Sequence, residues 1–282
     1  MSNLFGLDPE YSAYETSRIA VLPVPFERSS SWIRGSAQGA GAIIDASAQV
    51  ELYDIETDSQ IYTQGIHTAE PVFEETAESM IEAVRKKVAL FLNDRKLPVL
   101  IGGEHTVSIG AAMACRDHFN DLSILHLDAH ADRRESYNND PYSHASTIAR
   151  IKDIPADVVS VGIRSMDYSE KESAAEETVV YAHEAVQSSG WIERVTGSLS
   201  DHVYATIDMD VFDPAFVPSV GTPEPGGLDW YTVTGLMRNI CLEKRIVGFD
   251  IVELCPGENR ASDFTAAKLI YTLLSYIGDR NT

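Results

Sequence analysis

The sequence predicts an α/β protein in three layers, α/β/α, with a mainly parallel central sheet. Two observations predict this class. First, apolar β-prone segments alternate with helical ones, an order typical of parallel strands joined by right-handed crossovers. Second, several apolar segments run directly into glycine or into acidic and histidine residues, as strands do when their carboxyl ends supply a crevice with polar groups. No linker or repeat divides the 282 residues, so we expect one domain, 1–282.

The predicted strands are short apolar segments rich in Val and Ile and bounded by polar or glycine residues. They span residues 18–24, 98–103, 123–127, 158–163, 178–181, 203–208 and 245–253. The clearest helix is 74–93, because its apolar residues recur at 3.6-residue spacing. The other predicted helices are 42–46, 106–116, 144–151, 185–196, 231–241 and 263–277. The polar segment 53–73 predicts no regular element, and the Pro- and Gly-rich loop 213–227 cannot be helical throughout.

Composition restricts the partners. The chain has 22 basic and 43 acidic side chains and a formal charge of −21, so nucleic acid and anionic membranes are poor partners, whereas a small cationic substrate is favoured. No apolar run is long enough for a membrane helix, and the first residues do not resemble a signal peptide. Three widely spaced cysteines predict no disulfide framework, so we expect a cytoplasmic protein.

The segment that begins at His126 ends a predicted strand in three polar groups. Asp128, His130 and Asp132 stand at i, i+2 and i+4, so their side chains can converge on one point, which suits a metal ion. Taken alone, the segment is also compatible with a solvated acidic loop. His126 and His202 fall outside this pattern, and we expect them to pack or to support the site.

Two further strands end in similar groups. Strand 98–103 leads to His105, and strand 203–208 ends in Asp208, with Asp210 two residues later. The three strand ends offer two histidines and four aspartates, too many anionic ligands for one divalent cation and a suitable number for two. These ligand types favour Mn²⁺ over structural Zn²⁺. Two ions about 3.5–4 Å apart lower the pKa of a shared water, which predicts hydrolysis.

These motifs resemble, in order and spacing, the three signatures of the ureohydrolases, the arginase and agmatinase family. They are Gly102-Gly-Glu-His105, Asp128-Ala-His130-Ala-Asp132 and Asp208-Met-Asp210-Val-Phe-Asp-Pro214. The similarity extends over residues 17–277, and the segments 143–145 and 221–227 are similar to the agmatinase branch. The resemblance implies an arginase-like fold and two Mn²⁺ per subunit. The implied metal ligands are His105, Asp128, His130, Asp132, Asp208 and Asp210.

The resemblance also implies a reaction, hydrolysis of agmatine to urea and putrescine. Glu253 would pair with the substrate guanidinium, a planar cation that suits a carboxylate, although an exposed strand end is the alternative. Asp132 would also carry a proton to the departing amine. His144 would be a proton-shuttle histidine, unless it is a surface residue. The family implies a homo-oligomer, a trimer or a hexamer.

Several alternatives stay open. Another guanidino compound (N1-aminopropylagmatine, guanidinobutyrate or arginine) requires changes only in loops 27–41, 133–143 and 213–227, and the first loop departs from the common family pattern at 36–40. A binuclear phosphoesterase is disfavoured because its motifs come in another order and because no basic residues are expected around the site. A metal-binding scaffold without turnover is the non-enzymatic alternative.

Overall fold

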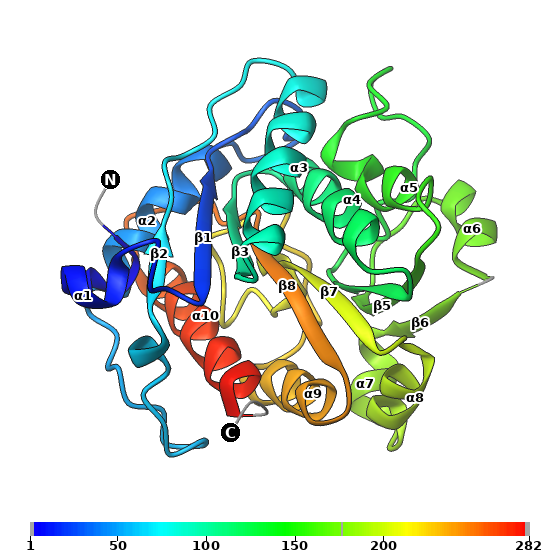
Figure 1. The fold of residues 1–282 in the computed structure, drawn as a ribbon. Coiled ribbons are helices and arrows are strands. Elements are labelled where there is room, and N and C mark those ends of the chain that lie inside the picture. The colour runs from blue at the N-terminus through cyan, green and yellow to red at the C-terminus, as the bar shows by residue number, and fades with distance from the viewer. Residues whose placement is uncertain (1–2, 176, 280–282) are drawn as a thin grey trace.

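The sheet at the centre of the molecule is entirely parallel. The computed structural model describes residues 3–175 and 177–279, and its eight strands lie in the order β2-β1-β3-β8-β7-β4-β5-β6. Helices cover both faces of this sheet, which confirms the predicted arginase-like α/β/α class (Figure 1). The strands are β1 (Ile19–Val24), β2 (Ile66–Thr68), β3 (Leu97–Gly102), β4 (Leu122–Leu127), β5 (Asp157–Ile163), β6 (Thr178–Tyr181), β7 (His202–Asp208) and β8 (Arg245–Val252).

Two hydrophobic cores form, one on each face of the sheet. Residues of α2, α8, α9 and α10 build the larger core, and residues of α3, α4 and α5 build the other. The helices are α1 (Pro9–Ser12), α2 (Gly39–Ser47), α3 (Ala77–Asn93), α4 (Ser108–His118), α5 (Thr147–Ile151), α6 (Lys171–Ala175), α7 (Ala182–Gln187), α8 (Trp191–Ser198), α9 (Trp230–Glu243) and α10 (Ala261–Asp279). Because the inner strands are covered on both sides, they are buried along nearly their whole length and mostly apolar rather than alternating.

Helix α3 illustrates how local sequence defines these elements. The Thr76 hydroxyl accepts a hydrogen bond from the Ser79 N–H and caps the first turn. Met80, Val84 and Val88 then fall on one face and are fully buried. The predicted helix 74–93 therefore exists, and its first turn starts three residues later than expected.

Several parts of the structure differ from the prediction. Segment 53–73 contains the short edge strand β2, which was not predicted because its three residues have no apolar period. Helices α1 and α6 were not predicted. The expected helix 185–196 is two helices, α7 and α8, separated at Gly190, which has φ +81°. As expected, the loop 213–227 contains no helix.

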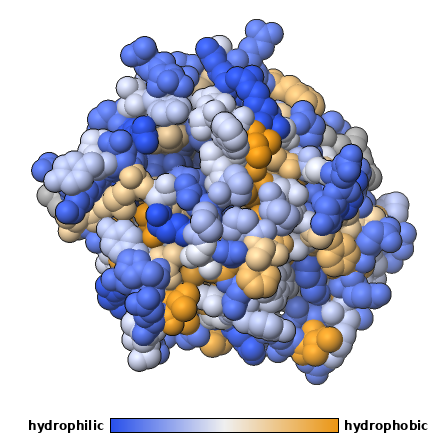
Figure 2. Space-filling model, turned by 180° about the vertical axis from the view of Figure 1, so that it is seen from behind, coloured by the Kyte–Doolittle hydropathy of each residue, from blue (hydrophilic) through white to orange (hydrophobic). Residues whose placement is uncertain are grey.

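The described surface is largely hydrophilic. Figure 2, viewed from behind Figure 1, shows polar residues over most of this face, with hydrophobic residues in small separate groups. Among the helices within 3–175 and 177–279, none combines the length and apolar character needed to cross a membrane.

Candidate metal centre

The order of the strands gathers the predicted site. Strands β3, β8, β7 and β4 are consecutive neighbours in the sheet, and all are parallel, so their carboxyl ends share one edge. His105 begins a short 3₁₀ turn three residues after β3, and Asp128 follows β4 directly. Asp208 is the last residue of β7, and Glu253 follows β8. Residues from four distant parts of the chain thus meet at this edge.

One group of side chains surrounds the imidazole of His105. Its Nδ1 lies 3.1 Å from Asp128 Oδ2, 3.1 Å from Asp132 Oδ2 and 3.6 Å from Asp208 Oδ2. All four residues are buried. Nδ1 nevertheless makes no hydrogen bond within the described chain. A buried nitrogen facing three carboxylates without a hydrogen bond is suited to sharing a cation with them.

A second group surrounds the imidazole of His130. Its Nδ1 lies 2.9 Å from Asp210 Oδ2 and 3.6 Å from Asp128 Oδ1. The two oxygens of Asp128 therefore face the two different histidines. Backbone N–H groups hold the aspartates in place: Ala129 donates to Asp210 Oδ1, and Asp210 donates to Asp208 Oδ1. The six predicted ligands form two adjoining groups that share Asp128.

The electrostatics of the site favour cations. Burial and the nearby Asp128 raise the pKa of Asp132 to about 7. Burial and the neighbouring Asp210 raise the pKa of Asp208 well above its usual value. Burial lowers the pKa of His130, but Asp210 and Asp128 outweigh it and raise that pKa to about 12. The buried carboxylates thus repel one another and stabilise positive charge, so the donor set fits divalent cations.

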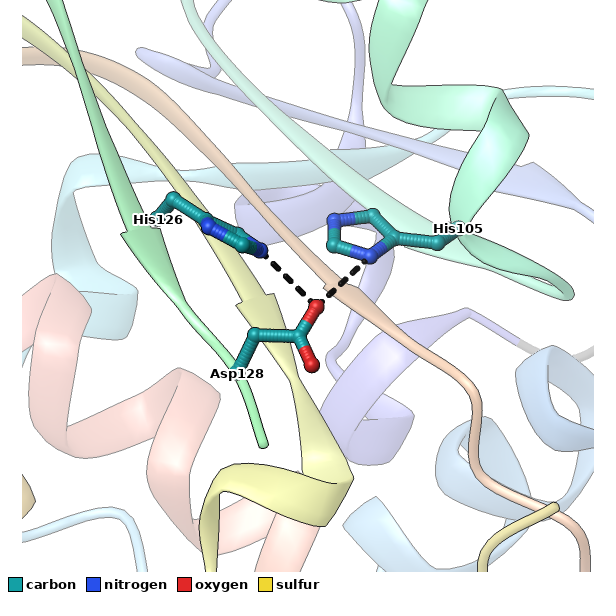
Figure 3. Close-up of side chains that lie close together, drawn as sticks. All are labelled: His105, His126 and Asp128. Carbon is teal, nitrogen blue, oxygen red and sulfur yellow. Dashed lines mark hydrogen bonds and ion pairs between the residues drawn. The ribbon is translucent and has the colours of Figure 1, made fainter. Parts of the chain in front are cut away.

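His126 supports Asp128 from within β4. Figure 3 shows the imidazoles of His126 and His105 both directed at the Asp128 carboxylate, with His126 Nε2 2.8 Å from Oδ2. The other nitrogen, Nδ1, lies 3.1 Å from Ser160 Oγ, which already accepts a hydrogen bond from Arg133. The ionised Asp128 carboxylate can only accept, so the proton of a neutral His126 resides on Nε2 and the Ser160 hydroxyl donates to Nδ1. Burial lowers the pKa of His126, consistent with the neutral form.

This tautomer decides whether His126 binds a metal ion or supports Asp128. His105, His126 and Asp128 are close enough to bind one ion, as are Asp128, His130 and Asp210. However, a protonated Nε2 donates to Asp128 and has no lone pair for a metal. The geometry matches the expected supporting role. His202, in contrast, stands at the amino end of β7 and contacts Asp121, away from this edge.

Glu253 and His144 lie beside the two groups. Glu253 Oε1 accepts the backbone N–H of His105 at 2.7 Å and lies 3.8 Å from His144 Nδ1. Glu253 is buried and His144 is largely buried. Glu253 is therefore not an exposed strand end, and His144 is not a surface histidine. Burial and the neighbouring Glu104 raise the pKa of Glu253 well above its usual value. Burial and the cationic His130 lower the pKa of His144 to about 4.

Two site residues have left-handed backbone conformations. Asp132 has φ +53° and Glu253 has φ +63°, values that are uncommon for residues other than glycine. Such conformations cost about 1–3 kcal/mol each and collect at functional sites. Sequence spacing alone could not show them. They turn the two carboxylates away from the directions that continuing strands would give.

Glu104 is a structural residue of the site that the sequence analysis did not single out. It is fully buried, and its Oε2 accepts the N–H groups of Arg28 and Ser29 at 2.7 and 2.6 Å. Its other oxygen accepts the hydroxyls of Ser29 and Thr106. Glu104 thereby fixes the start of loop 27–41 beside the site. The sequence feature that could have indicated this role was an acidic residue between a buried strand and a buried turn.

A cavity of ≈ 230 Å³ opens onto the site. Its lining includes His130, Asp132, His144 and Asp208. The expectation that basic residues are absent is wrong, because Arg134 also lines it. The Arg134 guanidinium lies 3.7 Å from a Glu170 carboxylate oxygen, so a negative group lies close to its positive charge. One such arginine among so many carboxylates does not make a phosphate site.

The comparisons with known proteins agree with this geometry. A match to the arginase family covers residues 17–275. The chain belongs to the arginase family. This membership confirms the resemblance to the ureohydrolases that the three motifs indicated.

Individual members of the arginase family match along nearly their whole length. The N(1)-aminopropylagmatine ureohydrolase of Synechocystis sp. is 33% identical over 280 residues, which are 95% of this chain and 92% of the relative. The protein of the same name from Thermus thermophilus is 36% identical over 269 residues, 94% of this chain and 92% of the relative. The solved agmatine ureohydrolase of Thermoplasma volcanium is 31% identical, has a TM-score of 0.88, and matches over 99% of this chain and 95% of its own.

Proposed function

We propose that this protein is a manganese-dependent ureohydrolase that releases urea from a linear cationic guanidino compound. The observation that carries the proposal is the convergence of two histidines and four aspartates at one sheet edge of an arginase-family chain. The proposed ligands of the two ions are His105, Asp128, His130, Asp132, Asp208 and Asp210. When bound, the two ions supply a nucleophilic water of lowered pKa and offset the carboxylate charge.

Glu253 is the proposed partner of the guanidinium group. Its Oε1 is held by the His105 N–H, which fixes the carboxylate plane at the site. A planar cation with parallel N–H donors binds such a fixed carboxylate with defined orientation, and this presents its central carbon to the metal centre. Burial strengthens the attraction, since little water competes for either charge.

Asp132 and His144 are the proposed proton carriers. Asp132 faces both the His105 group and the cavity, so its carboxylate can take a proton from the nucleophile and give it to the departing amine. His144 lines the same cavity, and its buried Nε2 has no hydrogen-bond partner among the described residues. Its lowered pKa leaves this imidazole neutral, so Nε2 can accept a proton and pass it to solvent.

We propose N1-aminopropylagmatine as the first substrate to consider, and agmatine as the second. The relatives at 33% and 36% identity carry the former name, and the solved structure at 31% identity carries the latter. The mouth of the cavity suits a long polycation. Asp167 lines it with an exposed carboxylate, and the indole of Trp32, which is 76% exposed, follows Ser31 of the lining. Both side chains can attract an additional ammonium group.

A urea-release screen on the manganese-loaded protein tests this proposal. The substrates are N1-aminopropylagmatine, agmatine, guanidinobutyrate and arginine. We expect kcat/KM for the first to exceed that for agmatine by about tenfold, the scale of one added pocket contact. Preference for agmatine would support the second candidate, and preference for arginine or the acid would reject both. A folded, manganese-loaded protein inert toward all four would indicate a scaffold without turnover.

A matched pair of variants tests the cavity mouth. Trp32→Ala should raise KM for N1-aminopropylagmatine more than KM for agmatine, because only the longer substrate reaches further out. Phe73→Ala removes another exposed aromatic side chain and should change neither KM.

We also expect a homo-oligomer, a trimer or a hexamer, which light scattering of the purified protein would measure.

A further inference from the structure

A second cavity lies at the opposite edge of the sheet from the metal centre. Its volume is ≈ 920 Å³, and residues at the amino ends of β1, β3 and β8 line it, beginning with Ile19, Leu97 and Arg245. The final turns of α3, α4, α9 and α10 complete the walls, so the cavity lies where the starts of β1 and β8 approach the end of α10 (Figure 1). The proposed ureohydrolase reaction makes no use of it.

The charge of this lining is opposite to that of the protein. Five of the 22 Lys and Arg residues line the cavity, together with His118, and the described lining includes no Asp or Glu. The basic residues are Arg18, Arg95, Lys96, Lys244 and Arg245. Acidic residues outnumber basic ones 43 to 22 in the chain, so a random lining of this size would be mostly acidic. The cavity therefore concentrates positive potential on an otherwise negative molecule.

Two of these cations are fixed in the walls by uncharged acceptors. Lys96 is buried, and its Nζ donates to the carbonyl oxygens of Tyr14 and Ser17. The Nζ of Lys244 donates to the carbonyl of Leu199 at 2.7 Å. Carbonyl groups orient an ammonium group but do not cancel its charge. Within the described chain, neither lysine is paired with a carboxylate, so both charges remain available to an anion.

The three arginines extend from the rim. Arg18, Arg95 and Arg245 are exposed, and none of them makes an ion pair with a carboxylate of the described residues. Guanidinium groups bind carboxylates and phosphates through two parallel hydrogen bonds. The rest of the described lining is mostly apolar. Its apolar residues include Ile19, Ile61, Leu92, Phe119, Ile246 and Leu274.

We propose that this cavity binds a small organic anion that carries a carboxylate or phosphate group on an apolar body. The cations select the charged group, and the aliphatic and aromatic walls accept the body. The volume lies in the upper part of the range of about 300–1,000 Å³ that is usual for small-molecule sites. A cationic guanidino compound would be repelled here, so this ligand is not the substrate.

Calorimetric titration of the full-length, manganese-loaded protein tests the proposal with three octyl compounds below their micellar concentrations. Octyl phosphate and octanoate are the anionic probes, and octyltrimethylammonium has a similar chain with a positive charge. We expect at least one anion to bind with a stoichiometry of one per chain and to weaken as salt is added. Which anion binds more tightly identifies phosphate or carboxylate as the preferred group. Equal binding of the cation, or no saturable binding of either anion, would reject the site.

Paired variants locate the binding. Arg18→Gln with Arg245→Gln should weaken the anion about tenfold or more, since each lost guanidinium removes a charge-assisted contact. Lys86→Gln with Lys87→Gln makes the same charge change on the exposed side of α3 and should leave binding unchanged. Urea release should be unaltered in both pairs. Anion binding of unchanged strength in the first pair would place the anion outside this cavity and refute the proposal.

Discussion

Nε2 of His105 lies 2.9 Å from Oγ1 of Thr206, on the side of the ring opposite the carboxylates. The Thr206 hydroxyl also lies 2.7 Å from Asp250 Oδ1, to which it donates, and Tyr204 donates to the other oxygen of Asp250. All four residues are buried. The hydroxyl thus accepts from Nε2–H, so in the neutral form of the ring, the form that binds a metal, Nδ1 is unprotonated and directed at the site. A chain from Asp250 through Thr206 orients His105 for a metal ion.

Thr206→Val tests this orientation, because valine has the same shape and no hydroxyl. We expect manganese affinity to fall about 10- to 100-fold, as when other metal-supporting residues are removed. The metal-free protein should lose about 1–3 kcal/mol of unfolding free energy, because three buried polar groups, on His105, Asp250 and Ser108, lose a partner. Titration with manganese and urea denaturation measure the two effects.

Thr196→Val is the control for this variant. Thr196 is also buried, and its hydroxyl donates to Ile192 O within α8. The Thr196→Val variant should have a lower free energy of unfolding and an unchanged manganese affinity. Equal manganese affinity in the Thr206 variant and the wild type would show that the hydroxyl does not position the ligand.

Asp128→Asn should remove metal and activity together. Asp128 faces both histidine groups, so loss of its charge weakens both proposed ion positions. Metal analysis after dialysis should find fewer than two ions per chain, and added manganese should raise Tm less than in the wild type. Asp45→Asn changes an exposed carboxylate on α2 and should behave as wild type. Full turnover with two retained ions in the Asp128 variant would contradict the two-metal assignment.

Chelator treatment of the wild type should reproduce these losses. A bound ion that the unfolded chain does not hold stabilises the fold by about 2.7 kcal/mol at one hundred times its Kd. Tm should therefore fall when EDTA strips the metal and recover with manganese. A Tm that is insensitive to both additions would argue against a metal at this site.

Glu253→Gln should lower kcat/KM about 10- to 100-fold, the equivalent of about 1.5–3 kcal/mol for a hydrogen bond to a charged group. Glutamine can still accept the His105 N–H, so bound manganese should remain near the wild-type amount. Glu258→Gln, in the exposed loop after β8, is the matched control. Unchanged kinetics in the Glu253 variant would remove this residue from substrate recognition.

The cysteines should be unreactive in the folded protein. Burial and the nearby Glu253 raise the pKa of Cys255 to about 12, and burial raises that of Cys115 further. A raised thiol pKa leaves only about one thiolate in 10⁴ at pH 8, and the thiolate is the reactive form. A disulfide reagent at pH 8 should label the native chain slowly and all three cysteines in denaturant. Rapid labelling of the native chain would contradict the buried placement of the thiols.

Much of the architecture could be predicted because it depends on local pattern. Apolar runs such as 123–127 become strands, and the spacing of Met80, Val84 and Val88 produces α3. Polar residues that follow strands of a parallel sheet meet at one edge, so the six ligands could be grouped before their distances were known. The edge strand β2 escaped prediction because its few residues have no apolar period.

The sequence by itself determined the fold class, the family and the residues of the proposed metal centre, because each depends on short motifs and on the periods of helices and strands. Only the tertiary structure decided which side chains assist them. Thr206 contacts His105, which is 101 positions away in the sequence, and Glu104 contacts Arg28, which is 76 positions away. The basic cavity likewise joins residues from Arg18 to Gly278. Such contacts follow from the strand order β3-β8-β7-β4 and from helix packing, which no local pattern encodes.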